Sequence, residues 1–156
     1  MSFISIHQYL SKLQVVFLAL LIAPLLAFIV LHFLPEQNPP DSPVLQNVLI
    51  GAALLDGLLA VILFNKKIKS ARKAQGLGAK LDKYFSITIV RYSFLSSSGL
   101  ILAVGFFLTH SNVFTVFYLV SLIFSILLRP TGPRVSNDLM LKGDEREMVY
   151  FRKDAL

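Results

Sequence analysis

The hydrophobic pattern of this chain is block-like, with long apolar runs separated by short polar segments. Apolar residues dominate four runs, at about residues 13–34, 44–64, 84–109 and 113–128. A helix that crosses a bilayer needs about 20 predominantly apolar residues, and these runs are close to that length or longer. We therefore predict an all-α integral membrane protein, in which four transmembrane helices form an antiparallel bundle within residues 1–129.

The first run lies where a signal peptide would lie, but it is too long for one. The apolar core of a signal peptide has about 7–15 residues, and no small-residue cleavage motif follows residues 13–34. We expect this run to remain in the protein as a membrane anchor.

Charge is divided unequally between the polar segments that join the runs. Residues 35–43, PEQNPPDSP, carry Glu36 and Asp41 but no basic residue. Residues 65–83 carry seven basic side chains against one acid, Asp82. Because basic loops stay on the cytoplasmic side, we predict that 65–83 is a cytoplasmic loop and that both termini are cytoplasmic. The expected location is a bacterial-type inner membrane.

The composition supports a membrane location and excludes several other classes of protein. Hydrophobic residues make up 55% of the chain, above the average of about 45–50% for soluble domains. The chain has no cysteine, which excludes disulfides and thiolate metal sites. Its net charge of +6 lies in segments that flank the apolar runs, so we expect lipid and not nucleic acid as the partner of the basic residues. No cofactor is expected.

Residues 130–156 form a polar tail of mixed charge after the last apolar run. Asp144 and Glu147 have the spacing of a capping box, which predicts one short helix. A segment of this size cannot build a hydrophobic core alone. We expect the tail to dock on the helices, on the basic loop, on lipid or on another subunit.

Two charged residues interrupt the predicted spans, Asp56 in the second and Arg91 in the third. Counted from Asn65 and Tyr84, they lie about 13 and 10 Å from the cytoplasmic ends of their helices. An unpaired charge inside a span costs about 2.5–3.5 kcal/mol, so an Asp56–Arg91 ion pair is the simplest explanation. The pair is either a structural pin that fixes helix register or a proton or ion site. Alternatively, Arg91 extends to the cytoplasmic interface, and Asp56 is protonated or bound by hydroxyls.

Small residues recur at every fourth position within three of the predicted spans. This spacing lets helices approach closely, and close packing drives association in lipid. The residues concerned are Ala19, Ala23 and Ala27 in the first span, Ala53 and Gly57 in the second, and Gly99 and Ala103 in the third. We expect these faces to pack against other helices.

Polar side chains form two further groups. Hydroxyl residues share one face of the fourth span, namely Thr115, Tyr118, Ser121 and Ser125. They are interpreted either as interhelical hydrogen-bonding groups, worth about 0.6 kcal/mol each, or as the lining of a hydrated pathway. Five basic residues after the second span are predicted to contact anionic lipid headgroups, at about 1 kcal/mol each. These are Lys66, Lys67, Lys69, Arg72 and Lys73.

The sequence favours a small accessory or scaffold subunit that packs through its small-residue faces, in a homo-oligomer or a larger membrane complex. The alternative is a small transporter or channel protomer that uses Asp56 and Arg91. Enzymatic activity has little support, because no Ser, His and Asp set lies at one depth and no metallohydrolase spacing occurs. No catalytic or metal-binding residue is assigned.

Overall fold

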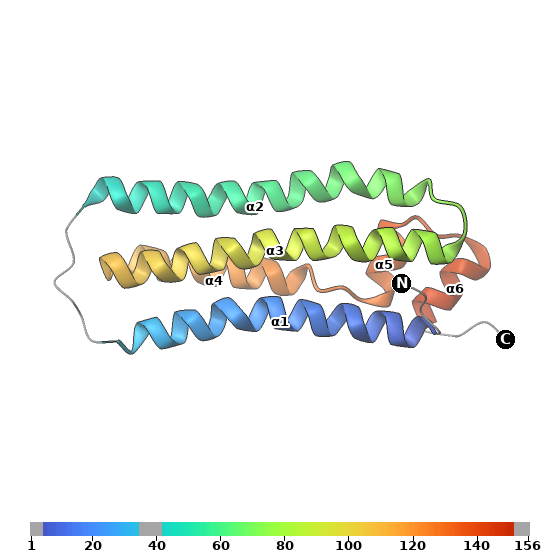
Figure 1. Cartoon of the computed structure of the whole chain (residues 1–156), viewed down its shortest axis with the longest axis horizontal. Coiled ribbons are helices and arrows are strands. Elements are labelled where there is room, and N and C mark those ends of the chain that lie inside the picture. The colour runs from blue at the N-terminus through green and yellow to red at the C-terminus, as the bar shows by residue number, and fades with distance from the viewer. Residues whose placement is uncertain (1–4, 35–41, 152–156) are drawn as a thin grey trace.

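The computed structural model describes residues 5–34 and 42–151, and within these ranges it is all-helical with six helices. The helices are α1 (Ile6–His32), α2 (Pro43–Arg72), α3 (Leu77–Thr109), α4 (Asn112–Leu127), α5 (Gly132–Asp138) and α6 (Gly143–Phe151). The long helices α1 to α4 lie side by side along one axis (Figure 1). The short helices α5 and α6 lie at the end where α1 begins and where α2 joins α3 (Figure 1).

Helices α1, α2 and α3 are each long and apolar enough to cross a membrane. Helix α4 has 16 residues, about 24 Å, which is shorter than the hydrocarbon core of about 30 Å. It becomes a fourth candidate span only together with α5, from which it is bent by 83°. The residues that the structure describes therefore form an all-helical fold with three to four candidate spans. The acidic connection predicted at 35–43 falls almost entirely outside the described residues.

Helix α3 is the centre of the fold. It packs against α1, α2 and α4, and half of its most apolar window is buried, against 11% for α1 and 17% for α2. Its sequence explains this position, because serine, glycine and alanine replace bulky residues along the buried faces and allow close approach. The small buried residues are Ser96, Ser98, Gly99, Ala103 and Gly105.

Side-chain caps and one left-handed residue set the ends of these helices. Ser5 and Ser42 accept hydrogen bonds from backbone N–H groups in the first turns of α1 and α2, and Thr131 does the same for α5. His110 ends α3 in the left-handed region, with φ 48°, and its N–H donates to the Phe106 carbonyl over 2.7 Å. This tight stop brings α4 directly back along α3.

The basic segment 65–83, expected to be a loop, is helical except for residues 73–76. Helix α2 continues to Arg72 because Phe64, Ile68 and Ala71 form a buried stripe at helical spacing. Lysine, arginine and alanine are also good helix formers. The reversal occurs at Gly76, whose φ of +82° suits glycine. The charged face of each helix points outward while its apolar face extends the core.

The tail folds into two helices instead of one, and we refer to residues 130–151 as the end cap. Helix α6 covers the predicted Asp144–Glu147 region, whereas α5 was not predicted. Thr131 caps α5, and proline is tolerated in a first turn. Val135, Leu139, Leu141 and Val149 of the end cap share one hydrophobic core with residues of α1, α2 and α3. The tail thus docks on the helices.

Candidate functional site

The side chains of Asp56 and Arg91 do not form an ion pair in the described part of the chain. The register of α2 against α3 explains why. Ser98 Oγ donates to the Ala53 carbonyl over 2.9 Å, so Asp56 lies at about the level of Leu95, one turn away from Arg91. Arg91 extends away from Asp56 and lies over the Phe64 ring, 4.3 Å from its centroid. Phe64 follows Asp56 by two turns, about 12 Å along α2.

Arg91 is buried, with 5% of its surface exposed, near the junction between α3 and the end cap. Its Nε atom has no hydrogen-bond partner among the described residues. The charged residues whose fields reach Arg91 are Arg134 and Asp138, both on α5. The Arg91 guanidinium therefore lies over the ring of Phe64 and near that of Tyr92, 5.9 Å from its centroid, on the side of the end cap. The Arg91 side chain thus points out of the apolar run, as in the alternative in which it does not pair with Asp56.

Asp56 itself is half-buried on α2, between the buried residues Ala53 and Ala60. No described residue forms a hydrogen bond or an ion pair with its carboxylate. Asp56 is the one acidic residue of the apolar run at 44–64.

A hydrogen-bond network ties the end cap to the long helices. Tyr84 Oη donates to Asp138 Oδ2 over 2.9 Å, and Arg72 Nε donates to the Asp138 backbone carbonyl over 2.7 Å. Arg134 Nη1 donates to the Leu127 carbonyl over 2.5 Å, where α4 ends. Lys80 and Glu145 form an ion pair at 2.6 Å. Arg72, predicted to face lipid headgroups, therefore helps to hold the end cap.

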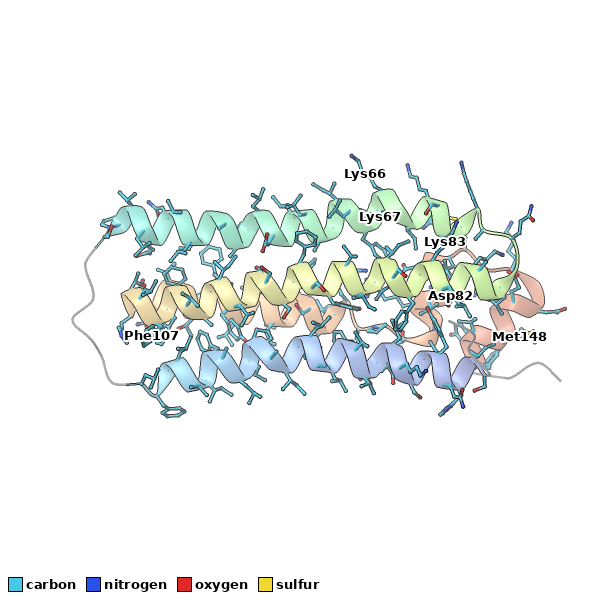
Figure 2. The ribbon with its side chains drawn as sticks, in the orientation of Figure 1. Lys66, Lys67, Asp82, Lys83, Phe107 and Met148 are labelled. Carbon is cyan, nitrogen blue, oxygen red and sulfur yellow. The ribbon has the colours of Figure 1, made fainter. Side chains whose placement is uncertain are left out.

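The remaining predicted lipid contacts lie on the surface. Lys66, Lys67, Lys69 and Lys73 are all exposed. Figure 2 shows Lys66 on the outer side of α2, whereas Lys67 and Lys83 lie between α2 and α3. Lys83 was not among the predicted headgroup contacts, because the interpretation of 65–83 as a loop gave no reason to place it opposite Lys67.

The predicted small-residue faces have different surroundings. Ala53, Gly99 and Ala103 are buried. A Cβ at Gly99 would meet Pro24 Cβ at 3.0 Å, so this glycine allows α1 to approach α3 closely. Gly57 is half-buried with open space beside it. The α1 residues Ala19 and Ala23 are exposed and Ala27 is half-buried, so that face has little cover in a single chain.

The hydroxyl face of α4 points toward α1 and α3, yet none of its hydroxyls donates across a helix interface in the described residues. Ser125 Oγ donates to Ser121 O of its own helix, and the buried Tyr118 hydroxyl has no hydrogen-bond partner among the described residues. The Tyr118 ring instead stacks on Phe28, with centroids 4.2 Å apart. The hydrogen bonds between the long helices come instead from residues outside this face, namely Tyr9 to Leu81, Ser98 to Ala53 and Tyr92 to Leu128 at the end of α4.

A small cavity lies among α1, α3 and α4 beside this hydroxyl face. Its volume is about 20 Å³, which leaves room for about one water molecule. The residues around it include Pro24, Tyr92, Ser96, Tyr118 and Ser125. The space is too small to hold a solute, and most of its lining is apolar.

In the ranges 5–34 and 42–151, no group of three or more His, Asp or Glu residues is placed to hold a metal ion. Comparison of the chain with protein-family models, with curated proteins and with solved structures finds no match.

Proposed function

We propose that this protein is a non-enzymatic accessory or scaffold subunit of a bacterial-type inner membrane. Its four long helices form an antiparallel bundle in the bilayer, and both termini and the end cap are cytoplasmic. The observation that carries the proposal is the shared core in which the end cap packs with α1, α2 and α3. A tail fixed in this way is a rigid surface that another protein can recognise without the entropic cost of ordering it.

The proposed orientation follows from the charges at the two ends. Residues 65–83 lie at the end-cap end of the helices and carry seven basic side chains, whereas α1 ends and α2 begins at the other end, and the sequence between these two helices is acidic. The positive-inside rule then puts the end cap in the cytoplasm.

Close packing along α3 favours a scaffold over a transporter protomer. The cavity among α1, α3 and α4 has a volume of about 20 Å³. A larger pocket of about 260 Å³ among α2, α3 and α4 has an almost entirely apolar lining that does not include Asp56, and Arg91 is covered by Phe64 instead of facing Asp56. A transport site needs groups that converge on a space large enough for the solute. The described residues supply no such convergence at Asp56.

The surface offered to a partner includes exposed apolar residues of the end cap. Met140 and Phe151 are 62% and 61% exposed, and Tyr150, whose ring lies 5.0 Å from that of Phe151, is 40% exposed. Exposed apolar groups outside a membrane span are typical of protein contact sites. The end cap is therefore the proposed interface with a cytoplasmic or membrane-bound partner.

Orientation is testable by cysteine labelling, because the chain contains no cysteine of its own. Gln75→Cys lies in the turn between α2 and α3, and Asn112→Cys lies at the opposite end, where α4 begins. A membrane-impermeant maleimide added to intact cells should label Asn112→Cys directly and Gln75→Cys only after permeabilisation. The reverse result would overturn the orientation.

The scaffold role is tested by assembly and by ion flux together. In native gels of solubilised membranes, we expect Met140→Asn to shift the chain to a smaller species and the matched surface variant Lys142→Asn to leave its size unchanged. Purified protein in proteoliposomes should carry no pH-driven flux above that of empty vesicles. A flux that Asp56→Asn abolishes would replace the scaffold with the transporter.

A further inference from the structure

An open groove runs between α2 and α3 on the face that carries Lys67 and Lys83 (Figure 2). Its volume is about 520 Å³, within the range of about 300–1,000 Å³ that small-molecule sites occupy. The walls come from Lys67 and Ser70 of α2 and from Asp82, Lys83, Ser86, Ile87 and Val90 of α3. The groove is thus polar toward the turn at 73–76 and apolar at its other end.

The position of this groove along the helices matches the border of the proposed membrane. Its apolar end, Val90, is adjacent to Arg91, and Arg91 lies at the level of Phe64, where the apolar run of α2 ends. From Val90 to Asp82 the groove covers about 12 Å of α3. A molecule that fills it would have its apolar part beside the acyl chains and its polar part in the headgroup layer.

The charge of the groove selects for a phosphate group. Lys67 and Lys83 are exposed and belong to opposite walls, so their ammonium groups can bind one anion from two sides. The serines contribute less, because Ser70 Oγ donates to Lys67 O over 2.9 Å and Ser86 Oγ donates to Asp82 O over 3.3 Å. Asp82 engages other groups of the protein and reduces the local charge to about one positive unit.

We propose that this groove binds one anionic phospholipid of the cytoplasmic leaflet. The phosphodiester lies between the ammonium groups of Lys67 and Lys83, and an acyl chain runs over Ile87 and Val90. A lipid with a single negative charge and an uncharged headgroup alcohol, such as phosphatidylglycerol, fits the net charge of the walls. The inference rests on the proposed membrane orientation. It goes further, because it requires one defined lipid-binding site, whereas a basic surface can attract anionic lipids without any defined site.

Native mass spectrometry of the full-length protein in detergent tests this site. The probes are phosphatidylglycerol, phosphatidylcholine and phosphatidylethanolamine with identical acyl chains. We expect one phosphatidylglycerol to bind preferentially, and Lys67→Ala or Lys83→Ala to weaken its binding about fivefold, equivalent to about 1 kcal/mol per lysine. Lys67→Arg should retain most of the affinity.

The matched control is Lys66→Ala, which removes the same charge from the neighbouring position on the outer side of α2 (Figure 2). It should change phosphatidylglycerol binding by less than twofold, and all variants should keep the wild-type unfolding temperature. Equal losses from Lys66→Ala and Lys67→Ala would overturn the site in favour of diffuse attraction. Equal binding of phosphatidylcholine or phosphatidylethanolamine would overturn the phosphatidylglycerol selectivity. Neither result bears on the labelling and assembly experiments, which test the proposed function separately.

Discussion

The ring of Phe114 lies directly on the backbone of Gly105, where α4 turns back along α3. A Cβ atom at residue 105 would lie 2.7 Å from ring atoms Cδ1 and Cζ and closer still to Cε1. Phe114 is fully buried, and Cβ atoms in proteins essentially never lie under 3.0 Å from a neighbouring heavy atom. The contact fixes how near the two helices come, and only glycine at position 105 permits it.

Gly105→Ala should therefore lower the free energy of unfolding by about 1–3 kcal/mol, because the added methyl must displace Phe114 or separate the helices. Thermal unfolding followed by circular dichroism in detergent measures the change. The matched control is Gly57→Ala, at a position with open space beside it, which should be neutral or stabilising by up to about 1 kcal/mol. In a double-mutant cycle, Phe114→Leu should relieve part of the Gly105→Ala penalty; strict additivity would contradict the contact.

Asp56→Asn should leave the free energy of unfolding unchanged or raise it, because no described residue forms an ion pair with Asp56 and an unpaired charge inside a span is costly. Removing one partner of a buried ion pair costs about 3–5 kcal/mol instead. The same denaturation experiment decides between these outcomes. A loss of several kcal/mol, cancelled in the charge-swapped double variant with Arg91→Asp and Asp56→Arg, would establish the pair predicted from the sequence.

Tyr84→Phe should loosen the end cap. The substitution removes the hydrogen bond from Tyr84 Oη to Asp138 Oδ2, and a bond to a charged group contributes about 1.5–3 kcal/mol. Hydrogen exchange of α5 and α6 should become faster, while exchange in α4 stays unchanged. Tyr150→Phe makes the same chemical change at an exposed position and serves as the control. Unaltered exchange in α5 after Tyr84→Phe would show that apolar packing alone holds the end cap.

Met140→Asn should stabilise the fold by about 1 kcal/mol. Met140 has a φ of 54°, in the left-handed region, where a side chain such as methionine is strained and asparagine is tolerated. The expected result is a higher unfolding temperature for Met140→Asn and no increase for Lys142→Asn. Since Met140 is also part of the proposed partner surface, loss of assembly with raised stability would separate binding from folding. A lower unfolding temperature would contradict the strain.

The positions of the long helices were predictable because hydrophobicity alone determines them. The runs at 44–64 and 84–109 lie within α2 and α3, whereas the runs at 13–34 and 113–128 extend past the ends of α1 and α4 by two residues and by one residue. The continuation of α2 through 65–72 was not predicted, because the many charged residues there indicated a loop. The apolar residues Phe64, Ile68 and Ala71 form a buried stripe in the same segment. A helical-wheel projection that separated the two faces would have found it.

The direction of Arg91 was not predictable from depth along a helix. Similar distances from the helix ends made Asp56 a plausible partner, yet those ends were assumed to lie in one plane. The observed register puts Ala53 beside Ser98 and Phe64 beneath Arg91. The register of α2 against α3 depends on how the small residues of the two helices fit together. The spacing of small residues along each helix does not determine that fit.

The central position of α3 also constrains how the chain assembles during synthesis. In the part of the chain that the structure describes, α1 and α2 pack mainly on α3 and have little contact with each other. When the ribosome has released only residues up to the turn at 73–76, the first two helices have no surface to join. Emergence of α3 supplies that surface to both at once, so the third helix acts as the template for folding. A chain shortened before Leu77 should remain as two separate helices, exposed to membrane proteases.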